Sequence, residues 1–216
     1  MFLELEKKSL LLIGMVAFVF TNCSAQNSVS LNKKSLNAIN RNLTTDSKNE
    51  VDVVYLDAKP GDGMAILEDT EFKTGTIRLD IQGEDNPGKS FVGIAFNVQN
   101  DSTYESIYFR PFNFKSPNKD RRAHSVQYVY HPDYPWKRLR DEQKGKFEAE
   151  YAEAPSPNDW FNIAVTIQDN KVIVKDGNSE NVLLEVQRLA EPSSDKIAFW
   201  VGNNSQGSFR NLQVSR

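Results

Sequence analysis

The stretch YFRPFNF at residues 108–114 combines four aromatic rings with an arginine, a proline and an asparagine. Aromatic rings suit a hydrophobic core, but an unpaired guanidinium inside a core is costly. A site that grips a flat polar ligand can use both kinds of group, because rings stack and the guanidinium donates hydrogen bonds. The composition of this stretch therefore marks it as a candidate ligand site as well as a strand.

A second group of rings and cations follows in HPDYPWKRLR, residues 131–140. Prolines on both sides of Tyr134 stiffen this segment, which we expect to be a loop, and a stiff loop presents its side chains at a lower entropic cost. Pyranose rings stack on Trp and Tyr, and their hydroxyls pair with amide, guanidinium and carboxylate groups, so these residue types indicate a sugar site. The candidate ligand-binding residues are Asp80, Asn97, Tyr108, Arg110, Gln127, Tyr134, Trp136 and Arg140.

These residues also have an ordinary structural interpretation. Arg110 can pair with Asp80 on a solvated sheet face, where such pairs are common. Trp160 and Trp200 are more typical of core or edge packing than of a ligand platform. The basic run KDRR at 119–122 is typical of a solvated loop. The sequence leaves the choice between ion pairing and ligand recognition at Arg110 open.

The elements that must position these residues are strands. Apolar residues recur with a period of two along most of the chain, and the intervening segments, such as PGDG and GNNSQG, are rich in turn formers. No segment keeps a helical period; residues 137–154 come closest, and Gly145 interrupts them. Many short strands without helices predict an all-β sandwich or barrel. The expected strands lie at 51–56, 76–82, 91–99, 106–110, 125–130, 161–168, 171–175, 182–186, 196–202 and 209–214.

The alternation also assigns side chains to the two faces of each strand. Ile107 and Phe109 are expected to point inward, which turns their neighbours Tyr108 and Arg110 outward. One outer face should then collect charge, rings and a floor of small residues, and an open sheet of that kind can hold a ligand. The residues expected to point outward include Arg78, Asp80, Gly93, Ala95, Asn97, Tyr108, Arg110, Ala198 and Trp200.

The first 25 residues are expected to be a secretory signal. Lys7 and Lys8 precede the apolar run LLLIGMVAFVF, which gives way to TNCSAQ. The run is only about half as long as the ~20 residues of a membrane-crossing helix, so we expect no permanent transmembrane anchor. Two exits remain open: cleavage before Gln26, or lipidation of Cys23 as the first residue of a lipoprotein. We expect the protein to be exported to the periplasm, the cell surface or the medium, and an outer-membrane lipoprotein is one form of this. Contact with the membrane is expected only through a lipid on Cys23.

The length of the remaining chain is typical of a single domain. Cys23 is the single cysteine, so the exported chain has no disulfide and its core must hold it together. About 190 residues support one core. The net charge of −3 is unchanged when the leader, with two lysines and two glutamates, is removed, and this argues against a nucleic-acid partner. We divide the chain into the signal 1–25, a tether 26–49 whose SVSL segment can form a first edge strand, and a sandwich domain 50–216.

Four consecutive segments carry a resemblance: FVGIAFNVQNDSTYESIYFRPFNF, SVQYVYHPDYPWKRLR, DWFNIAVTI and KIAFWVGNNSQGSFRNLQV. With the F-x-x-G-x-I-x-x-D pattern near residues 72–80, they make residues 50–216 resemble LamG-like jelly-roll domains of secreted bacterial proteins, in the concanavalin A-like lectin/glucanase superfamily. The chain is also similar to the 3-keto-disaccharide hydrolase family, which shares that fold. The resemblance implies a jelly-roll β-sandwich of two antiparallel sheets, while members of the superfamily bind sugars, cleave them or act as adhesive modules.

The paired carboxylates of the superfamily's glucanases are not expected at their usual place. Those enzymes carry Glu-x-Asp followed shortly by Glu, whereas the aligned stretch here is RLDIQGE, with Arg78 in the nucleophile position and Glu84 past a glycine. Retaining hydrolysis needs two carboxyls about 5 Å apart on one face. Three hypotheses remain: a carbohydrate-binding domain for an oligosaccharide or glycoside, a hydrolase or lyase acting on (3-keto-)disaccharides, and an adhesion module that binds protein.

No metal or cofactor is expected. His124 and His131 lie seven residues apart without a cysteine, which does not match a zinc site, so we interpret both as surface or structural residues. Some relatives bind calcium, and GEDNPG (83–88) or QNDST (99–103) offers oxygen ligands. Turns use Asp and Asn for backbone reasons, and we favour that interpretation of both segments.

Overall fold

The computed structural model describes residues 27–48 and 51–216. The predicted signal at 1–25, the candidate lipidation residue Cys23 and the two alternative exits lie outside these residues. The described helices are α1 (Lys119–Arg122) and α2 (Trp136–Glu142), and Lys33–Ser35 and Pro111–Asn113 form 3₁₀ turns. The strands are β1 (Asn27–Ser28), β2 (Leu36–Ile39), β3 (Leu43–Lys48), β4 (Val51–Leu56), β5 (Gly63–Leu67), β6 (Gly75–Gln82), β7 (Val92–Phe96), β8 (Tyr104–Phe109), β9 (Val126–His131), β10 (Glu148–Ala149), β11 (Phe161–Ile167), β12 (Lys171–Asp176), β13 (Val182–Gln187), β14 (Ala198–Val201) and β15 (Gly207–Ser215).

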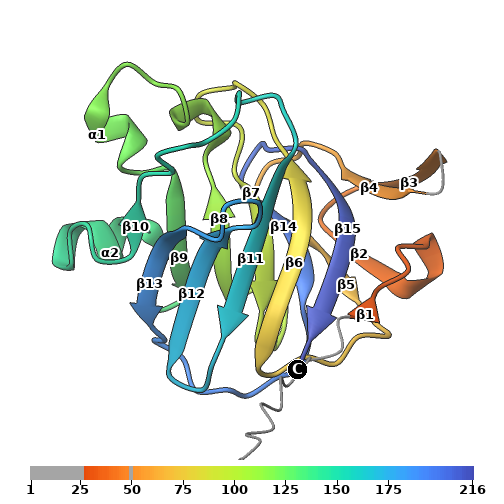
Figure 1. Ribbon diagram of the computed structural model, residues 1–216. Coiled ribbons are helices and arrows are strands. Elements are labelled where there is room, and N and C mark those ends of the chain that lie inside the picture. The colour runs from red at the N-terminus through yellow and green to blue at the C-terminus, as the bar shows by residue number, and fades with distance from the viewer. Residues whose placement is uncertain (1–26, 49–50) are drawn as a thin grey trace, which may run out of the picture.

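The strands form two antiparallel sheets that face each other (Figure 1). Sheet A has the order β13-β12-β11-β6-β15-β4-β3, with β1 paired to β15, and sheet B has the order β10-β9-β8-β7-β14-β5-β2. Several neighbours are distant in sequence, since β6 pairs with β11 and β15, and β14 pairs with β5 and β7. This arrangement confirms the predicted all-β jelly-roll sandwich of two antiparallel sheets.

The core lies between the sheets, where the period-two alternation places the apolar side chains. The predicted inward residues of sheet A, Ile77, Leu79 and Ile81, are completely buried. Sheet B supplies its own inward row, and Phe199 stacks on Phe209 of sheet A with ring centroids 4.6 Å apart. Alternation therefore predicted which side chains face the opposite sheet, but it did not predict burial on the outer side of sheet B, where Ala95, Tyr108 and Trp200 are buried as well. The inward residues predicted for sheet B, all buried, are Val92, Ile94, Phe96, Val98, Ile107, Phe109, Ile197, Phe199 and Val201.

The N-terminal segment expected as a tether at 26–49 contributes strands to both sheets. β1 overlaps the SVSL segment only at Ser28 and pairs with β15, while β2 is one edge strand of sheet B and β3 is one edge strand of sheet A. Leu31, Leu36 and Leu43 are buried. The described part of this segment is therefore packed against the sandwich rather than extended away from it.

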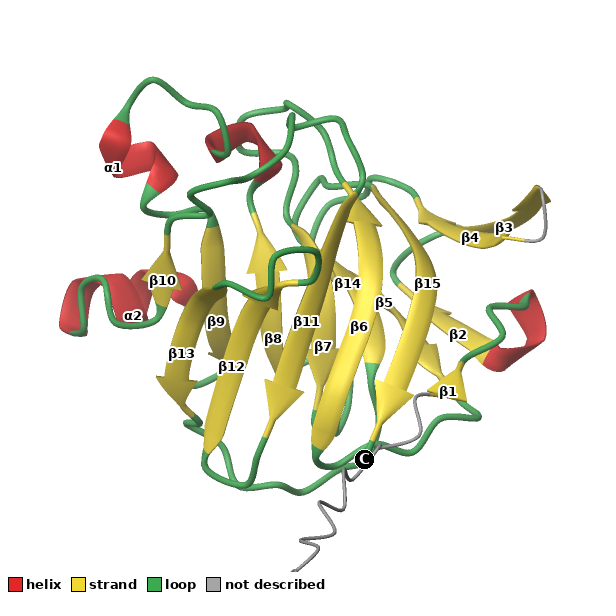
Figure 2. Cartoon of the chain, viewed as in Figure 1, coloured by secondary structure: helices red, strands yellow, loops and turns green. Residues whose placement is uncertain are grey.

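Two expected loops are helical, and both helices lie beside the β9–β10 end of sheet B (Figure 2). The 131–140 segment was predicted as a loop; instead α2 begins at Trp136. Two ion pairs between residues four apart, Lys137–Asp141 and Arg138–Glu142, stabilise the helix. The side chain of Leu139 is buried, and the helix packs against β9. The KDRR run, also predicted as a loop, is the short helix α1. Within 27–48 and 51–216, no helix has the length and apolar character needed to span a bilayer.

Candidate functional site

The outer face of sheet B is hollowed by two adjoining clefts. The first, which we call the Arg110 cleft, has a volume of about 280 Å³, and the second, the Trp200 cleft, about 180 Å³. Phe91 and Trp136 line both, so the clefts meet at these two rings. The Arg110 cleft is lined by Phe91, Arg110, Phe112, Asn113, Arg121, His124, Trp136 and Arg140, and the Trp200 cleft by Asp62, Phe91, Tyr108, His131, Pro135, Trp136, Trp200, Gly202 and Asn203.

Arg110 sits at the end of β8, where the strand gives way to the 3₁₀ turn Pro111–Asn113. Its backbone N–H donates to the Ser125 carbonyl at 2.8 Å, which ties the turn to the start of β9. Alternation had turned Arg110 outward, and it does lie on the outer face, yet only 5 % of the residue is exposed. Because its neighbours are rings and polar groups of the cleft, the guanidinium is buried in the floor of the Arg110 cleft.

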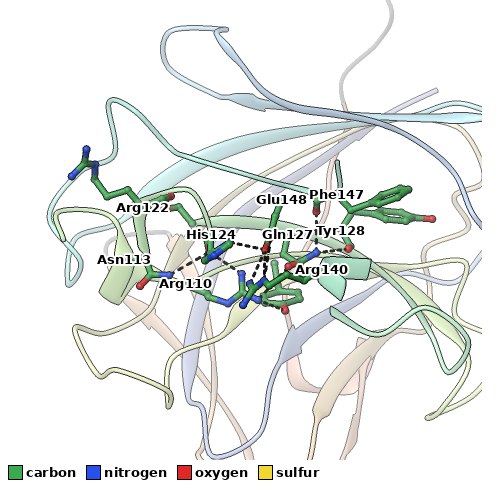
Figure 3. A network of polar contacts seen from close by, with 11 residues as sticks. Arg110, Asn113, Arg122, His124, Gln127, Tyr128, Arg140, Phe147 and Glu148 are labelled. Atoms are coloured by element: carbon green, nitrogen blue, oxygen red, sulfur yellow. Dashed lines mark hydrogen bonds and ion pairs between the residues drawn. The ribbon is translucent and has the colours of Figure 1, made fainter. Parts of the chain in front are cut away.

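The guanidinium of Arg110 is held by neutral partners (Figure 3). Nη1 donates to the His124 carbonyl at 2.7 Å, and Nη2 donates to the Tyr108 hydroxyl at 2.7 Å and to Gln127 Oε1 at 3.3 Å. The ring of Tyr108 lies 4.9 Å from the guanidinium carbon, in cation–π range. No carboxylate of the described residues forms an ion pair with Arg110. Burial lowers the pKa of Arg110, partly opposed by the nearby Tyr108 and Glu148.

A carboxylate, that of Glu148 in β10, contacts two residues that line the Arg110 cleft, Arg140 and His124. Arg140 donates to both of its oxygens, with Nη2 to Oε2 at 2.7 Å and Nε to Oε1 at 3.1 Å. His124 Nδ1 lies 2.8 Å from Glu148 Oε2, an ion pair when the imidazole is protonated (Figure 3). Burial lowers the pKa of His124, and the charges of Arg140 and Arg110 lower it further, while Glu148 raises it.

The aromatic surface of the clefts is built on a floor of small residues. Gly93 of β7 lies between Tyr108 and Trp200 in the sheet register, and a Cβ at this position would lie 2.6 Å from the Tyr108 Cα. The two large rings therefore pack over a glycine, with centroids 5.0 Å apart. Trp200 Nε1 donates to the Tyr104 hydroxyl at 3.0 Å, which fixes the indole against the sheet.

Trp136 is the exposed ring of the site. It is 44 % exposed, whereas the other rings of the two clefts are at least partly covered. The guanidinium carbon of Arg140, one turn further along α2, lies 4.9 Å from the Trp136 ring. Within the Arg110 cleft, Phe91 packs edge-on against Phe112 with ring centroids 5.6 Å apart. A flat ligand face can therefore rest on rings that are already held in place by their neighbours.

The structure brings five of the predicted ligand-binding residues together. Arg110, Trp136 and Arg140 line the Arg110 cleft, and Tyr108 and Trp136 line the Trp200 cleft. Gln127 lies directly beneath Arg110: its Oε1 accepts from the guanidinium, and its Nε2 donates to the Tyr128 and Phe147 carbonyls, each at 3.0 Å. Gln127 therefore orients Arg110 without lining either cleft.

Asp80 is not part of this site, and the predicted pairing with Arg110 is wrong. Asp80 lies on β6 of sheet A, where Arg210 Nε donates to it at 3.0 Å and Asn162 at 2.6 Å. Alternation correctly turned Asp80 outward, but outward from the opposite sheet. Arg210 in turn lies over Trp160, 4.2 Å from its ring centroid, so Trp160 also belongs to the sheet A surface.

Asn97 and Tyr134 also lie outside the two clefts. Asn97 follows the end of β7 with φ of 51°, so it leaves the strand alternation and points back into the fold. Its amide donates to Glu105 at 2.9 Å and its oxygen accepts from the Ser193 backbone at 2.8 Å. Tyr134 instead stacks on Tyr130 with centroids 6.2 Å apart. Both residues have structural partners that sequence alternation could not reveal.

The sequence interpretation missed other lining residues. His124 was interpreted as a surface or structural histidine, yet it lines the Arg110 cleft, and His131 lines the Trp200 cleft together with Asp62. Trp200, expected as packing, is 3 % exposed and forms one wall of its cleft. These residues come from strand ends and loops far apart in the chain. Their types were suggestive, but their meeting depends on the sheet order.

In the calcium-ligand candidate QNDST, Asn100 has turn partners. Asn100 Oδ1 accepts from the backbone N–H groups of Ser102 and Thr103, each at 2.9 Å, as expected for an Asx turn. In the part of the chain that the structure describes, no group of three or more His, Cys, Asp or Glu side chains is placed to hold a metal ion.

Comparisons with known proteins identify the fold. No protein-family model matches the chain, and no curated protein matches it in sequence. Among solved structures, it is similar to a Bacillus subtilis protein of unknown function with a galectin-like fold, at 11 % identity and a TM-score of 0.54, covering 84 % of this chain and 89 % of that one. A native glycosidic hydrolase matches at 8 % identity and a TM-score of 0.56, covering 91 % and 97 %. The exoplasmic/lumenal domain of VIP36 in a Ca²⁺/Man3GlcNAc-bound form matches at 10 % identity and a TM-score of 0.52, covering 87 % and 86 %.

These similarities establish a galectin-like jelly-roll sandwich. At such low sequence identity they concern the path of the backbone, since one sandwich fold can host unrelated binding and catalytic sites. The function must therefore be argued from the two clefts themselves.

Proposed function

We propose that this protein is a carbohydrate-binding β-sandwich that holds a glycan across the two clefts of sheet B. The observation that carries the proposal is the shared Phe91–Trp136 boundary, where an exposed indole stands beside the buried guanidinium of Arg110. Sugar rings need an apolar surface for their C–H faces and directed donors for their hydroxyls, and this site offers both. Each cleft is smaller than the about 300–1,000 Å³ of typical drug-sized pockets, which suits single sugar rings better than a large cofactor.

The structural neighbours are consistent with this proposal. One of them, the VIP36 domain, was solved with Man3GlcNAc bound, and another is a glycosidic hydrolase. Binding and hydrolysis therefore both occur on this fold. Of the residues that line the two clefts, Asp62 is the one carboxylate, and Glu148 is committed to Arg140 and His124. Hydrolysis by the usual carboxylate pair needs a second free carboxyl, so we favour binding over cleavage.

A glycan-array screen followed by calorimetry tests the proposal. Trp136→Ala should weaken binding of the best glycan by roughly 1–2 kcal/mol, the range for loss of a stacking ring. Trp160→Ala is the matched control, since Trp160 is also partly exposed but lies over sheet A. Equal losses from both substitutions, or binding of no glycan, would contradict the proposal.

The competing functions give different results in the same series. Release of products from a 3-keto-disaccharide or another glycoside would establish the hydrolase or lyase that the family resemblance implies. Binding of a protein partner that survives Trp136→Ala and is insensitive to glycans would instead indicate an adhesion module.

We propose too that the protein is exported through its leader, with Cys23 as the candidate lipid anchor. The supporting observation is the FTNCS sequence at the end of the apolar run. A lipidated protein should partition into detergent, and Cys23→Ala should release it. A soluble exported product whose first residue is Gln26 would show cleavage without lipidation.

A further inference from the structure

The two clefts differ in charge. Arg110, Arg121 and Arg140 line the Arg110 cleft, and the one carboxylate held against it, Glu148, already serves Arg140 and His124. The Trp200 cleft is lined by the carboxylate of Asp62 and by no lysine or arginine. An occupant that spans both clefts therefore meets excess positive charge at one end and a negative group at the other.

Arg110 retains hydrogen-bonding capacity toward the cleft. Its guanidinium has five N–H donors, and three hydrogen bonds engage one hydrogen of Nη1 and both of Nη2. The Nε hydrogen and the second Nη1 hydrogen have no hydrogen-bond partner among the described residues. A buried cation that faces only neutral partners lacks the counter-charge that usually accompanies burial. An anionic ligand would supply that charge and accept the remaining hydrogen bonds.

We infer that the ligand is an acidic glycan in which a uronic acid residue lies next to an uncharged sugar. This inference rests on the carbohydrate-binding function proposed above. The uronate carboxylate occupies the Arg110 cleft, since guanidinium and carboxylate are matched in shape as well as charge. The sugar ring rests on Trp136 and Phe91, and the uncharged neighbour occupies the Trp200 cleft. Asp62 disfavours a second carboxylate there, so a polymer of uronate alone is a poorer ligand.

Matched disaccharides measure each part of the inference. β-1,3-, β-1,4- and α-1,4-linked disaccharides would each be prepared as a neutral form, as a form with one uronate, and as a form with two. In calorimetry, the form with one uronate should bind about tenfold or more tightly than its neutral counterpart, because it gains a charge-assisted hydrogen bond. It should also bind more tightly than the form with two uronates. A 6-sulfated neutral disaccharide distinguishes a general anion site from a carboxylate site.

Substitutions locate the two preferences. Arg110→Gln should remove most of the preference for one uronate over the neutral form. Arg121→Ala, at an exposed residue whose side chain has no described partner, should reduce it with little risk to folding. Arg138→Gln is the control on the neighbouring surface, since Arg138 pairs with Glu142 and lines neither cleft. Asp62→Asn should narrow the ratio between the affinity for the form with one uronate and the affinity for the form with two, because it removes the negative charge from the Trp200 cleft.

The outcomes separate this inference from the proposed function. Neutral disaccharides that bind as well as acidic ones would overturn the acidic ligand while leaving carbohydrate binding intact. Tighter binding of the sulfated than of the uronate form would overturn the carboxylate assignment. Binding of no sugar in the series or on the array would overturn both.

Discussion

Among the buried arginine side chains of the described residues, Arg188 and Arg110 have opposite surroundings. The side chain of Arg188, just after β13, is 2 % exposed, and its Nη2 and Nε lie 2.5 and 3.1 Å from the two oxygens of Glu105. Tyr128 also donates to Glu105 at 2.6 Å. Arg110 is equally inaccessible, yet it faces a hydroxyl, an amide and a carbonyl at the bottom of a cleft.

The difference lies in how each charge is compensated inside the fold. Arg188 and Glu105 neutralise each other completely inside the fold and tie the β13 end of sheet A to β8 of sheet B. A fold can use such a pair as an anchor, although its desolvation cost offsets much of the attraction. Arg110 has neutral hydrogen-bond partners and no carboxylate partner among the described residues, and it lines a cleft. Its environment is thus a candidate for recognition, and that of Arg188 is complete as it stands.

The largest effect is expected from breaking the Arg188 pair. Glu105→Gln removes the carboxylate and leaves a buried guanidinium without its counter-charge, which should cost about 3–5 kcal/mol of the free energy of unfolding. Chemical denaturation would measure this loss. Glu185→Gln, in an exposed pair with Lys171, is the matched control and should cost less than about 1 kcal/mol. A loss as small as that of the control would mean that Arg188 is no anchor.

A smaller effect on stability is expected at Arg110. Arg110→Gln loses hydrogen bonds to neutral partners but also removes a poorly compensated buried charge, so the free energy of unfolding should fall by less than about 2 kcal/mol. The same denaturation measurement, beside that on Glu105→Gln, checks the ranking. If Arg110→Gln lowers the free energy of unfolding as much as Glu105→Gln does, and the folded fraction keeps its glycan affinity, then Arg110 is structural and the comparison fails.

The smallest effect concerns pH. Burial lowers the pKa of His124 and of His131 below the ordinary value of 6.5, with nearby Glu148 and Asp62 respectively opposing it. Between 6.5 and the lowered values the unfolded chain binds more protons than the folded one, so stability decreases as the pH falls through this window. Thermal melts from pH 7.5 to 5 should show a modest decline in Tm.

A double variant identifies the source of that decline. His124→Gln combined with His131→Gln should flatten the Tm profile in this window. Burial raises the pKa of Asp176, but hydrogen bonds from the Tyr151 hydroxyl and from backbone N–H groups together lower it below the ordinary value of 3.8. Asp176 therefore affects stability only at more acidic pH. An equally steep profile in the double variant would show that other groups dominate.

Local sequence patterns predicted part of the candidate site. The rings and cations of 108–114 and 131–140 do converge, because each stretch carries its chemistry in a few adjacent residues. Helix α2 was missed since it is only seven residues long, too short for a hydrophobic period to register. The charge pairs at 137–141 and 138–142 were the available signal for it.

The sequence by itself determined which side of its own strand each residue occupies, because successive side chains of a strand point to opposite faces. That rule turned Asp80 and Arg110 outward, and both are on outer faces. Only the tertiary structure decided that these faces lie on opposite sides of the sandwich. Strand order depends on pairings such as β6 with β15, more than a hundred residues apart in the chain, which no local period encodes. Asp80 therefore pairs with Arg210 on sheet A, while Arg110 lies on sheet B, lines a cleft and has no carboxylate partner among the described residues.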